Sequence, residues 1–402
     1  MAIKKSQEQK IKILLNRAVK EIINRDSLET KLKSGKVLRV KLGIDPTAPD
    51  IHLGHTVSLI KLKQFQDLGH KAVLIIGDFT ATIGDPTGRL ESRKPLLPQF
   101  VAENLKTYLK QIVKIIDVKK TEVRYNNEWF GKITPKKLFF LTSLATIQQA
   151  LEREDFQKRL KSNQAITLTE VLYSLFQGYD SVMVKADIEI GGEDQKVNLL
   201  MGRRVQRAYK VPEQDILTTW LIEGTDGAKK MSKSSGNYIG IAEKPNVMFG
   251  KIMSIPDSLI IKYFRALTMI ADSEIDKFEM ELRSKKTNPR DIKGILAFEI
   301  VRMYHGEKNA KEADEEFNKV FRKHELPEKI PIAILKKGPY DVIDLLLKLN
   351  LVKSKSEARR LVNENAVKIN SGIVKDSKIK INAASGLVVQ IGKKRFVKIG
   401  IK

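Results

Sequence analysis

The stretch VLRVKLGIDPTAPDIHLGH (residues 37–55) indicates a strand, a turn and the start of a helix in immediate succession. Apolar and other residues nearly alternate over 37–44, which is typical of a β-strand. Asp45-Pro46-Thr47 is a turn signal. We expect a helix to begin within His-Leu-Gly-His (52–55) and to continue to about Leu68. Strand–turn–helix units of this kind build α/β sheets.

Two of the chain's 5 histidines fall in that His52-Leu53-Gly54-His55 segment. With 24 glycines in 402 residues, composition predicts about 0.004 chance occurrences of His-x-Gly-His. The structural alternative is a pair of surface histidines at a helix start. A second segment, Lys230-Met231-Ser232-Lys233-Ser234, is weaker alone, because 73 residues are basic and a Lys/Ser loop is often only solvated. Together, and in this order, the two segments favour attack on the α-phosphate of ATP.

Strand and helix patterns alternate over most of the first 245 residues. Residues 7–33 have the spacing of an amphipathic helical segment, and AVLIIGD (72–78) is typical of a buried parallel strand. Further strands are expected at 122–126, 186–190 and 216–222, and further helices at 99–117, 146–160, 167–180 and 194–209. The alternation predicts an α/β fold whose catalytic domain, 1–245 with its N-terminal helix, is a doubly wound, Rossmann-like parallel sheet.

The pattern changes after residue 245, where strand signals disappear. Residues 246–330 predict a small all-helical domain with breaks at Pro and Asn-Pro. Ile330-Pro331 and Gly338-Pro339 suggest a linker at 331–338. Residues 339–402 predict an α+β module with helices at 341–350 and 355–364 and strands around 366–369, 387–391 and 396–401.

Composition narrows the class of protein. The chain has no Cys, which excludes disulfides, thiol catalysis and cysteine zinc sites. Its apolar runs are too short to span a bilayer and the N-terminus lacks a signal-peptide core, so we expect a cytoplasmic enzyme. The net charge is +25, and residues 331–402 hold 16 Lys and Arg against 5 Asp and Glu. This excess favours a polyanionic partner, although a general lysine bias would also raise the overall charge.

The residue types at the two signature segments suit a triphosphate. In an open α/β sheet, ligands bind beyond the carboxyl ends of the strands, and a helix N-terminus there attracts anions. Imidazoles can donate hydrogen bonds to phosphate, and Gly54 leaves room for a close-lying nucleotide. Lys230 and Lys233 lie on a Ser/Gly-flanked loop and can meet the charge that grows on departing pyrophosphate.

The chain resembles class I aminoacyl-tRNA synthetases, specifically the bacterial-type tyrosyl-tRNA synthetases. The resemblance covers nearly the whole length and rests on five segments in the family's order: KLGIDPTAPDIHLGH, GDFTATIGDPTGR, LYSLFQGYDSV, IGGEDQ and KMSKS (starting at 41, 77, 172, 190 and 230). It implies tyrosine activation with ATP as substrate, accompanied by Mg²⁺, no protein-bound metal or organic cofactor, tRNA(Tyr) as acceptor and a homodimer.

The resemblance also implies a role for individual residues. Tyrosine would be bound at its α-amino group by Asp85 with Tyr173 and Gln177, at its hydroxyl by Asp180, and near its carboxylate by Gln195. The catalytic residues would be Thr47, His52 and His55, which hold the triphosphate, and Lys230 and Lys233, which hold the leaving pyrophosphate. Asp194 and Gly192 would hold the ATP ribose. Asp45 and Gly54 would also bind ATP, and Arg89 and Arg93 would approach its phosphates.

The residues themselves support part of this assignment. Tyr173, Gln177 and Asp180 are spaced i, i+4 and i+7, so one helix face presents all three. A solvated polar stripe is the alternative, but the apolar neighbours of these residues indicate a half-buried helix. Asp85 could equally be a turn residue and Asp194 a helix cap. The chain departs from many tyrosyl enzymes at Lys41, where they have a second Tyr for the substrate hydroxyl.

The basic tail resembles the RNA-binding module named for the fourth small-subunit ribosomal protein, over residues 351–376. Its cations would contact RNA phosphates; they are Lys353, Lys355, Arg359, Arg360 and Lys368. A solvated helix face is the alternative.

Three other functions compete with tyrosine activation. Tryptophanyl-tRNA synthetases share the sheet and signatures, but Asp180 and the tail argue against them. A small-molecule nucleotidylyltransferase would not need the tail. An RNA-binding protein on an inactive synthetase scaffold would not need the intact signature residues.

Overall fold

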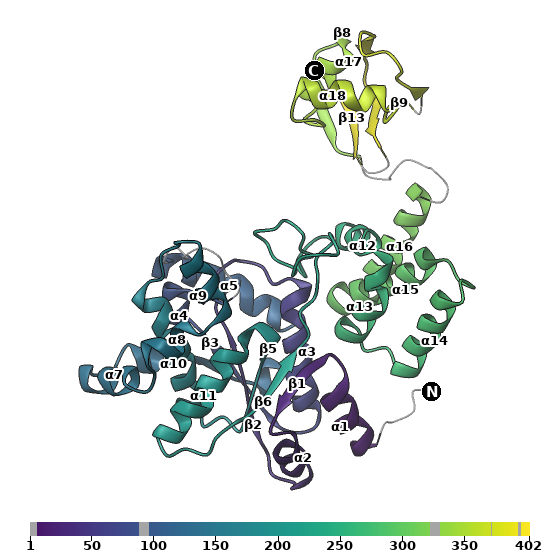
Figure 1. Cartoon of the computed structure of the whole chain (residues 1–402). Coiled ribbons are helices and arrows are strands. Elements are labelled where there is room, and N and C mark those ends of the chain that lie inside the picture. The colour runs from purple at the N-terminus through teal and green to yellow at the C-terminus, as the bar shows by residue number, and fades with distance from the viewer. Residues whose placement is uncertain (1–5, 88–95, 322–329, 371, 393–394) are drawn as a thin grey trace. The chain divides into compact units, whose positions relative to one another are not determined.

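The computed structural model describes residues 6–87, 96–321, 330–370, 372–392 and 395–402. The chain divides into two compact units, Met1–Ala310 and Lys311–Lys402. Figure 1 shows the first unit as a sheet flanked by helices and the second as a smaller body of strands and helices.

The first unit is built on a six-stranded sheet in the order β1-β6-β5-β2-β3-β4. Strands β2 to β6 are mutually parallel, and only β1 runs antiparallel to its neighbour β6. The strands are β1 (Val19–Ile23), β2 (Arg39–Ile44), β3 (Lys71–Ile76), β4 (Glu122–Tyr125), β5 (Ile188–Gly192) and β6 (Asp215–Thr219). Strand β3 is buried over its last five residues, as expected for a parallel strand covered on both faces. The predicted doubly wound α/β fold is confirmed.

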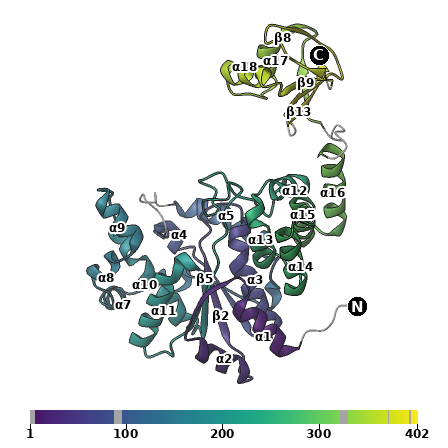
Figure 2. The same ribbon diagram turned by 45° about the vertical axis from the view of Figure 1, so that its right-hand side comes forward.

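Helices cover both faces of this sheet. Helix α3 lies on one side, and α10 and α11 lie on the other (Figures 1 and 2). The helices up to residue 208 are α1 (Gln7–Asn16), α2 (Arg25–Lys33), α3 (Leu53–Asp67), α4 (Thr80–Ile83), α5 (Pro98–Ile112), α6 (Asn127–Phe130), α7 (Pro135–Thr142), α8 (Ile147–Leu151), α9 (Glu154–Lys161), α10 (Leu168–Met183) and α11 (Lys196–Ala208), with short 3₁₀ turns at Val118–Lys120 and Glu193–Gln195. A capping box at Thr167 and Glu170 starts α10.

The prediction of one helical segment over 7–33 is wrong, because β1 interrupts it. Residues Ala18 and Asn24, on either side of this strand, have positive φ values of 54° and 63°, which end helical geometry. Strand β1 then pairs with β6, for example Ile22 with Leu217. This pairing is a tertiary contact that local periodicity does not reveal.

The predicted helix at 146–160 is in fact two helices, α8 and α9. The break lies at Arg153, whose backbone is extended at ψ 133°. The Arg153 guanidinium is buried and hydrogen-bonded to Asp155 and Asn198. The Arg153 side chain thus makes tertiary contacts at the point where α8 and α9 separate.

Helices alone follow the sheet, as expected after residue 245. They are α12 (Pro245–Met253), α13 (Ile260–Leu267), α14 (Asp272–Arg283), α15 (Pro289–His305) and α16 (Glu307–Phe321), with a 3₁₀ turn at Asp257–Leu259. Buried Arg17, after α1, donates to the carbonyls of Phe264 and Thr268 at the end of α13. Buried Lys61 on α3 donates to the carbonyls of Leu14 and Arg17. These bonds tie α3 to the helices of the 245–310 region.

The second unit has a small core between two helices and two sheets. Its elements are β7 (Ile332–Leu335), β8 (Gly338–Asp341), α17 (Val342–Lys348), α18 (Lys355–Asn363), β9 (Val367–Ile369), β10 (Gly372–Ile373), β11 (Lys380–Ala383), β12 (Val388–Ile391) and β13 (Arg395–Ile401). The predicted linker at 331–338 therefore contains a strand. Ala333 and Leu335 of β7 pack on the core while β7 pairs with β13. The limits of the predicted domains otherwise stay a prediction.

Among the helices of the described ranges, none combines the length and apolar character needed to cross a membrane.

Candidate active site

The polar residues singled out in the first unit gather where parallel strands end. Asp45 follows β2, Gly77 follows β3 and Asp194 follows β5, so all three lie at the carboxyl edge of the sheet. The N-terminus of α3 opens at the same edge, because α3 follows β2 after a short loop. This edge is where α/β sheets bind ligands.

His52 and His55 form a stacked pair at the start of α3. Their ring centroids are 3.7 Å apart, and the His52 backbone N–H donates to His55 Nδ1 at 3.3 Å. Burial, followed by the charges of His55, Lys230 and Lys233, lowers the pKa of His52 to about 2. The His55 ring reaches the surface, but the protein packed around it and the same two lysines lower its pKa to about 4. Both imidazoles are therefore neutral at pH 7, and His55 keeps its proton on Nε2.

Gly54 lies between the two histidines, at a position where a side chain would be crowded. A Cβ at this position would be 3.1 Å from Cε1 and Nδ1 of the His52 ring and 3.6 Å from Cβ of Met231. The absence of a side chain therefore lets the His52 ring and the Lys-Met-Ser-Lys-Ser loop approach the first turn of α3.

The Lys-Met-Ser-Lys-Ser loop (230–234) is joined to the start of α3. The Leu53 N–H donates to the carbonyl of Ile239 at 2.9 Å, and the Ile241 N–H donates to that of Ile51 at 3.0 Å. Met231 is buried, whereas Lys230 is exposed. The structure thus brings together two signatures that lie about 180 residues apart in the sequence.

Each lysine of this loop pairs with a carboxylate from another segment. Lys230 Nζ pairs with Asp194 Oδ2, and Lys233 Nζ lies 3.0 Å from Asp50 Oδ2. Lys233 also lies over the ring of Tyr238, 5.8 Å from its centroid. The loop therefore spans the sheet edge between the loop after β2 and the segment after β5.

Asn237 anchors the base of the same loop and was not predicted from the sequence. Its Oδ1 accepts from the Ser232 N–H at 2.8 Å, and its Nδ2 donates to Asp226 Oδ2 at 2.9 Å. Nδ2 also donates to the carbonyls of Lys229 and Lys230. An Asn after a Ser/Gly stretch is a common surface turn residue, so the sequence carries no signal for this role.

The predicted α-amino site is a group of bonded polar side chains. Tyr173 O–H donates to Asp45 Oδ2 at 2.9 Å, and Gln195 Nε2 donates to Asp85 Oδ2 at 2.6 Å. Burial, followed by the nearby carboxylates of Asp45, Asp85 and Asp180, raises the pKa of Tyr173 well above its ordinary value. A cation placed among these carboxylates would be stabilised by them.

Two further buried residues orient Gln195, and neither was predicted. Asn198 Nδ2 donates to Gln195 Oε1 at 2.9 Å, and Arg153 donates to Asn198 Oδ1 at 2.8 Å. Arg153 also binds Thr87 Oγ1 and Asp155. With its oxygen committed to Asn198, the Gln195 amide turns its N–H₂ towards Asp85.

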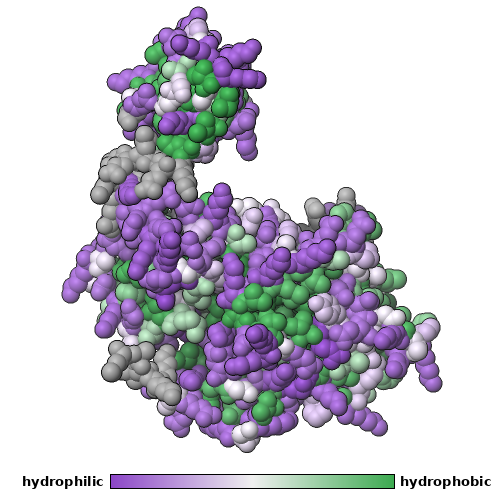
Figure 3. Space-filling view, turned by 180° about the vertical axis from the view of Figure 1, so that it is seen from behind, coloured by the Kyte–Doolittle hydropathy of each residue, from purple (hydrophilic) through white to green (hydrophobic). Residues whose placement is uncertain are grey.

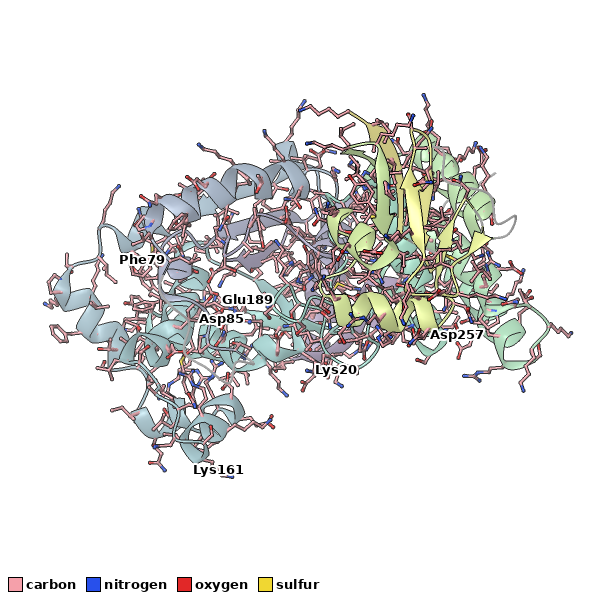
Figure 4. All side chains as sticks on the ribbon, turned by 90° about the horizontal axis from the view of Figure 1, so that it is seen from above. Lys20, Phe79, Asp85, Lys161, Glu189 and Asp257 are labelled. Atoms are coloured by element: carbon pink, nitrogen blue, oxygen red, sulfur yellow. The ribbon has the colours of Figure 1, made fainter. Side chains whose placement is uncertain are left out.

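Asp180 is buried on α10, one turn beyond Gln177. Trp129 Nε1 donates to its Oδ1 at 2.9 Å, and Asn126 Nδ2 lies 3.4 Å from its Oδ2. Gln177 donates through Nε2 to Glu189, which pairs in turn with Lys41. Tyr173, Gln177 and Asp180 all contact neighbouring elements, which excludes the solvated stripe considered above. Figure 4 labels Asp85 and Glu189, which belong to this part of the first unit.

The remaining predicted nucleotide residues line the same edge or lie outside the described ranges. Thr47 donates its N–H to the carbonyl of Asp45 at 2.8 Å. A Cβ at Gly192 would meet the Asp194 carboxylate and would be 3.1 Å from Leu221 Cδ2. Leu221 and Glu193 also border a pocket of about 370 Å³, but none of the predicted nucleotide residues that the structure describes lines it. Arg89 and Arg93 lie outside the described residues.

The predicted RNA-binding residues lie together in the second unit. Lys353 is exposed just before α18, Lys355, Arg359 and Arg360 are exposed on α18, and Lys368 is half-buried on β9. Lys355 pairs with Asp344 and Arg360 with Glu364, both on the surface. Exposed pairs of this kind are weak, so these cations stay accessible to an anionic partner.

Comparisons with known proteins cover both units. A family described as tRNA synthetases class I (W and Y) matches residues 33–322. One described as Tyrosine--tRNA ligase SYY-like C-terminal domain matches residues 323–399. The chain is 48% identical to a tyrosine--tRNA ligase of Thermotoga maritima over 98% of this chain and 97% of that protein. It is 50% identical to one of Carboxydothermus hydrogenoformans, with 96% of each covered.

Solved structures agree on the fold. A C-terminally truncated mitochondrial tyrosyl-tRNA synthetase of Aspergillus nidulans superposes with a TM-score of 0.65, covering 79% of this chain and 95% of that one. At 21% identity this likeness concerns the fold alone. The matches of both units and the identity to full-length relatives show that the chain belongs to the class I tRNA synthetases of the tryptophan and tyrosine family.

Proposed function

We infer that this chain is a tyrosine--tRNA ligase. It joins L-tyrosine to ATP to form tyrosyl-adenylate and pyrophosphate, and then transfers the tyrosyl group to the 3′-terminal ribose of tRNA(Tyr). The observation that carries tyrosine specificity is the buried carboxylate of Asp180, held by Trp129 and Asn126. Such a carboxylate can accept one more hydrogen bond, from a phenolic O–H.

Tyrosine binds with its two ends against carboxylates. The α-ammonium group faces Asp85 and the Tyr173 hydroxyl, with Gln177 nearby, and the phenolic hydroxyl faces Asp180. Gln195 lies by the substrate carboxylate and is held in place by its bonds to Asp85 and Asn198. Phenylalanine lacks the phenolic O–H and leaves the buried Asp180 without that additional hydrogen-bond donor, which makes phenylalanine binding unfavourable.

ATP binds across the N-terminus of α3 with the Mg²⁺ that accompanies it. Phosphates and water usually supply most of the Mg²⁺ ligands, so few protein carboxylates are required. Neutral His52 and His55 donate hydrogen bonds to phosphate oxygens, and Thr47 and the α3 dipole add to them. Asp194, with Gly192 beside it, takes the ribose, and Asp45 and Gly54 border the nucleotide. Arg89 and Arg93 approach the phosphates.

Binding of ATP requires Lys230 to move. In this structure Lys230 pairs with Asp194, the residue that we assign to the ribose. When ATP occupies Asp194, Lys230 becomes available for the phosphates, as does Lys233 on leaving Asp50. The loop therefore changes partners from carboxylates to pyrophosphate as the reaction proceeds.

The first step needs positioning and charge rather than proton transfer. A tyrosine carboxylate oxygen attacks the α-phosphorus, and the bond from that phosphorus to the β-phosphate oxygen breaks. The carboxylate is ionised at pH 7, so no general base is needed. Lys230 and Lys233 stabilise the charge that develops on the leaving pyrophosphate. In the second step a hydroxyl of the tRNA terminal ribose attacks the tyrosyl carbonyl carbon and AMP leaves.

The tRNA contacts extend beyond the site of chemistry. We assign the helical region 246–330 to the approach of the anticodon. The exposed cations of the second unit bind RNA phosphates outside the acceptor end. A cytoplasmic location fits a chain without cysteines that binds tRNA.

The enzyme works as a homodimer. Several large apolar side chains are exposed on neighbouring helices of the first unit, among them Phe139 and Phe140 on α7, Ile147 on α8, Leu168 on α10 and Leu200 on α11. Apolar patches of this kind mark association surfaces. Figure 3 shows apolar surface exposed among hydrophilic residues on one face of the molecule.

Amino-acid-dependent ATP–pyrophosphate exchange, run with each of the twenty amino acids, tests the function. Exchange with tyrosine, and weakly or not at all with tryptophan and phenylalanine, is the expected result. Exchange with tryptophan alone, or with none, would refute it.

A further inference from the structure

A buried ion pair lies beneath the assigned tyrosine site, between strands β2 and β5. Lys41 and Glu189 are directly opposite one another in the parallel ladder. Lys41 has no exposed surface and Glu189 is 1% exposed, and Lys41 Nζ is 2.8 Å from Glu189 Oε1. Two charges in the interior carry a large desolvation cost, which an apolar pair at these positions would avoid. Their place next to a binding site therefore suggests a function in that site.

The Lys41 ammonium group has no proton left for a ligand. It contacts Glu189 Oε1, Ser181 Oγ at 2.7 Å and the carbonyl of Gln177 at 2.8 Å. An ammonium group has three donors and no acceptor. Many tyrosyl enzymes have a second Tyr at this position as a direct partner of the substrate hydroxyl. Lys41 thus does not take over that role.

Glu189 is also fully engaged, and two of its partners lie on the helix that carries Asp180. Its Oε1 accepts from Gln177 Nε2 at 3.2 Å, and its Oε2 accepts from Ser181 Oγ at 3.1 Å and from Gln214 Nε2. Gln177 and Ser181 lie on α10 three residues before and one residue after Asp180. The ion pair therefore holds α10 on both sides of Asp180.

We propose that Lys41 and Glu189 are positioning residues for tyrosine recognition, which hold α10 and set the charge of Asp180 so that its carboxylate accepts the phenolic O–H. This rests on the assignment of Asp180 to the substrate hydroxyl in the proposed function. Neither residue touches the substrate.

The charges around Asp180 shift its pKa in opposite directions. The charged or titratable groups that face it are Lys41 on β2, Glu189 on β5 and Tyr173 on α10. Burial raises the pKa of Asp180 to about 7, Lys41 opposes this rise, as do the bonds from Trp129 and Asn126, and Glu189 adds to it. The ionised carboxylate accepts from all three donors, whereas protonation places a competing O–H on one oxygen.

The test is the pH dependence of the KM for tyrosine between pH 6 and 9, measured by ATP–pyrophosphate exchange. Lys41→Met removes a cation and raises the midpoint of the profile, and a rise of one pH unit increases the KM below the midpoint about tenfold. Glu189→Gln removes an anion and lowers the midpoint. Opposite shifts are expected, because a purely structural role would raise the KM in both variants without moving the midpoint.

Two further variants keep the test decisive. Lys31→Met breaks the ion pair with Asp215 elsewhere on the sheet and leaves the midpoint unchanged. If Lys41→Met does not fold, the double variant Lys41→Met/Glu189→Gln, which has no charge at the pair, replaces it. The midpoint of the double variant must then be higher than that of Glu189→Gln. Midpoints that move together, or that do not move, overturn the proposal.

Asp180→Asn separates this inference from the proposed function. If Asp180→Asn keeps full preference for tyrosine over phenylalanine, the assignment of Asp180 itself is wrong. If it loses at least about tenfold in that preference while the midpoints of the Lys41 and Glu189 variants stay at the wild-type value, only the positioning role is wrong.

Discussion

Replacing Asn237 by Ala should slow tyrosine activation without weakening tyrosine binding. Asn237 is 4% exposed and joins Asp226, the backbone before the Lys-Met-Ser-Lys-Ser loop and the N–H of Ser232. None of these groups belongs to the tyrosine pocket. Loss of the amide therefore loosens the loop that carries Lys230 and Lys233 and leaves Asp180 and its neighbours unchanged.

The size of the effect follows from the hydrogen bonds that are lost. The Oδ1 bond is 2.8 Å, and two amide protons are shared by three acceptors at 2.9, 3.2 and 3.3 Å. These amount to about three good bonds of about 1 kcal/mol each. Because we assign the loop to the transition state, the rate constant for activation should fall between about tenfold, if water replaces most of the bonds, and about 100-fold.

Steady-state ATP–pyrophosphate exchange measures both parts of this prediction. The kcat should fall by the stated factor, and the KM for tyrosine should stay within about twofold of wild type. Asn309→Ala, an exposed Asn on α16 whose amide donates to the carbonyl of His305, is the matched control and should leave both constants unchanged. A tyrosine KM that rises as much as kcat falls would refute the reasoning.

Three further changes test other parts of the molecule. Gly54→Ala places a Cβ 3.1 Å from the His52 ring, so kcat/KM for ATP should fall about tenfold with an unchanged KM for tyrosine; an unchanged kcat/KM would contradict this contact. Burial lowers the pKa of Lys61 to about 7 from its ordinary 10.5. Between these two pH values the unfolded chain holds a proton on Lys61 that the folded chain has lost, so the free energy of unfolding rises with pH. Urea unfolding should therefore show wild type gaining about 2–3 kcal/mol relative to Lys61→Met from pH 7 to 9, and a pH-independent difference would refute it. Lys353→Ala/Arg359→Ala should reduce the salt dependence of tRNA binding by about two phosphate contacts and leave pyrophosphate exchange unaffected; an unchanged slope would exclude these residues from the interface.

Local sequence patterns predict a helix or strand when the pattern lies entirely within that helix or strand. Strand β3 is a continuous apolar run and α10 has a clear capping box, so both lie close to their expected positions. Strand β1 was missed because Val-Lys-Glu-Ile-Ile fits a helical stripe equally well, and its partner β6 lies almost 200 residues further along the chain. Strand β7 was missed because neighbouring prolines outweighed a short alternation of apolar residues.

The site residues also fall into those that the sequence predicts and those that only the structure reveals. Residues within the signature segments could be proposed from their order along the chain, and their individual roles stay predictions. Asn237, Asn198 and Arg153 could not be found, because a polar residue in a sequence carries no sign of the tertiary contacts that bury it. In the sequence, Lys41 differs from a family pattern but has no visible partner; the pairing of β2 with β5 places Glu189 opposite it.

We propose that the two signature segments act on the triphosphate while a separate pocket binds tyrosine. The most direct test is the single-turnover rate of tyrosyl-adenylate formation in Lys230→Ala/Lys233→Ala, with the Kd for tyrosine measured by equilibrium dialysis. The expected result is a rate constant reduced by at least about 100-fold, because electrostatic stabilisation of the transition state is lost, with an unchanged Kd. A weakened Kd with a wild-type rate constant would contradict it.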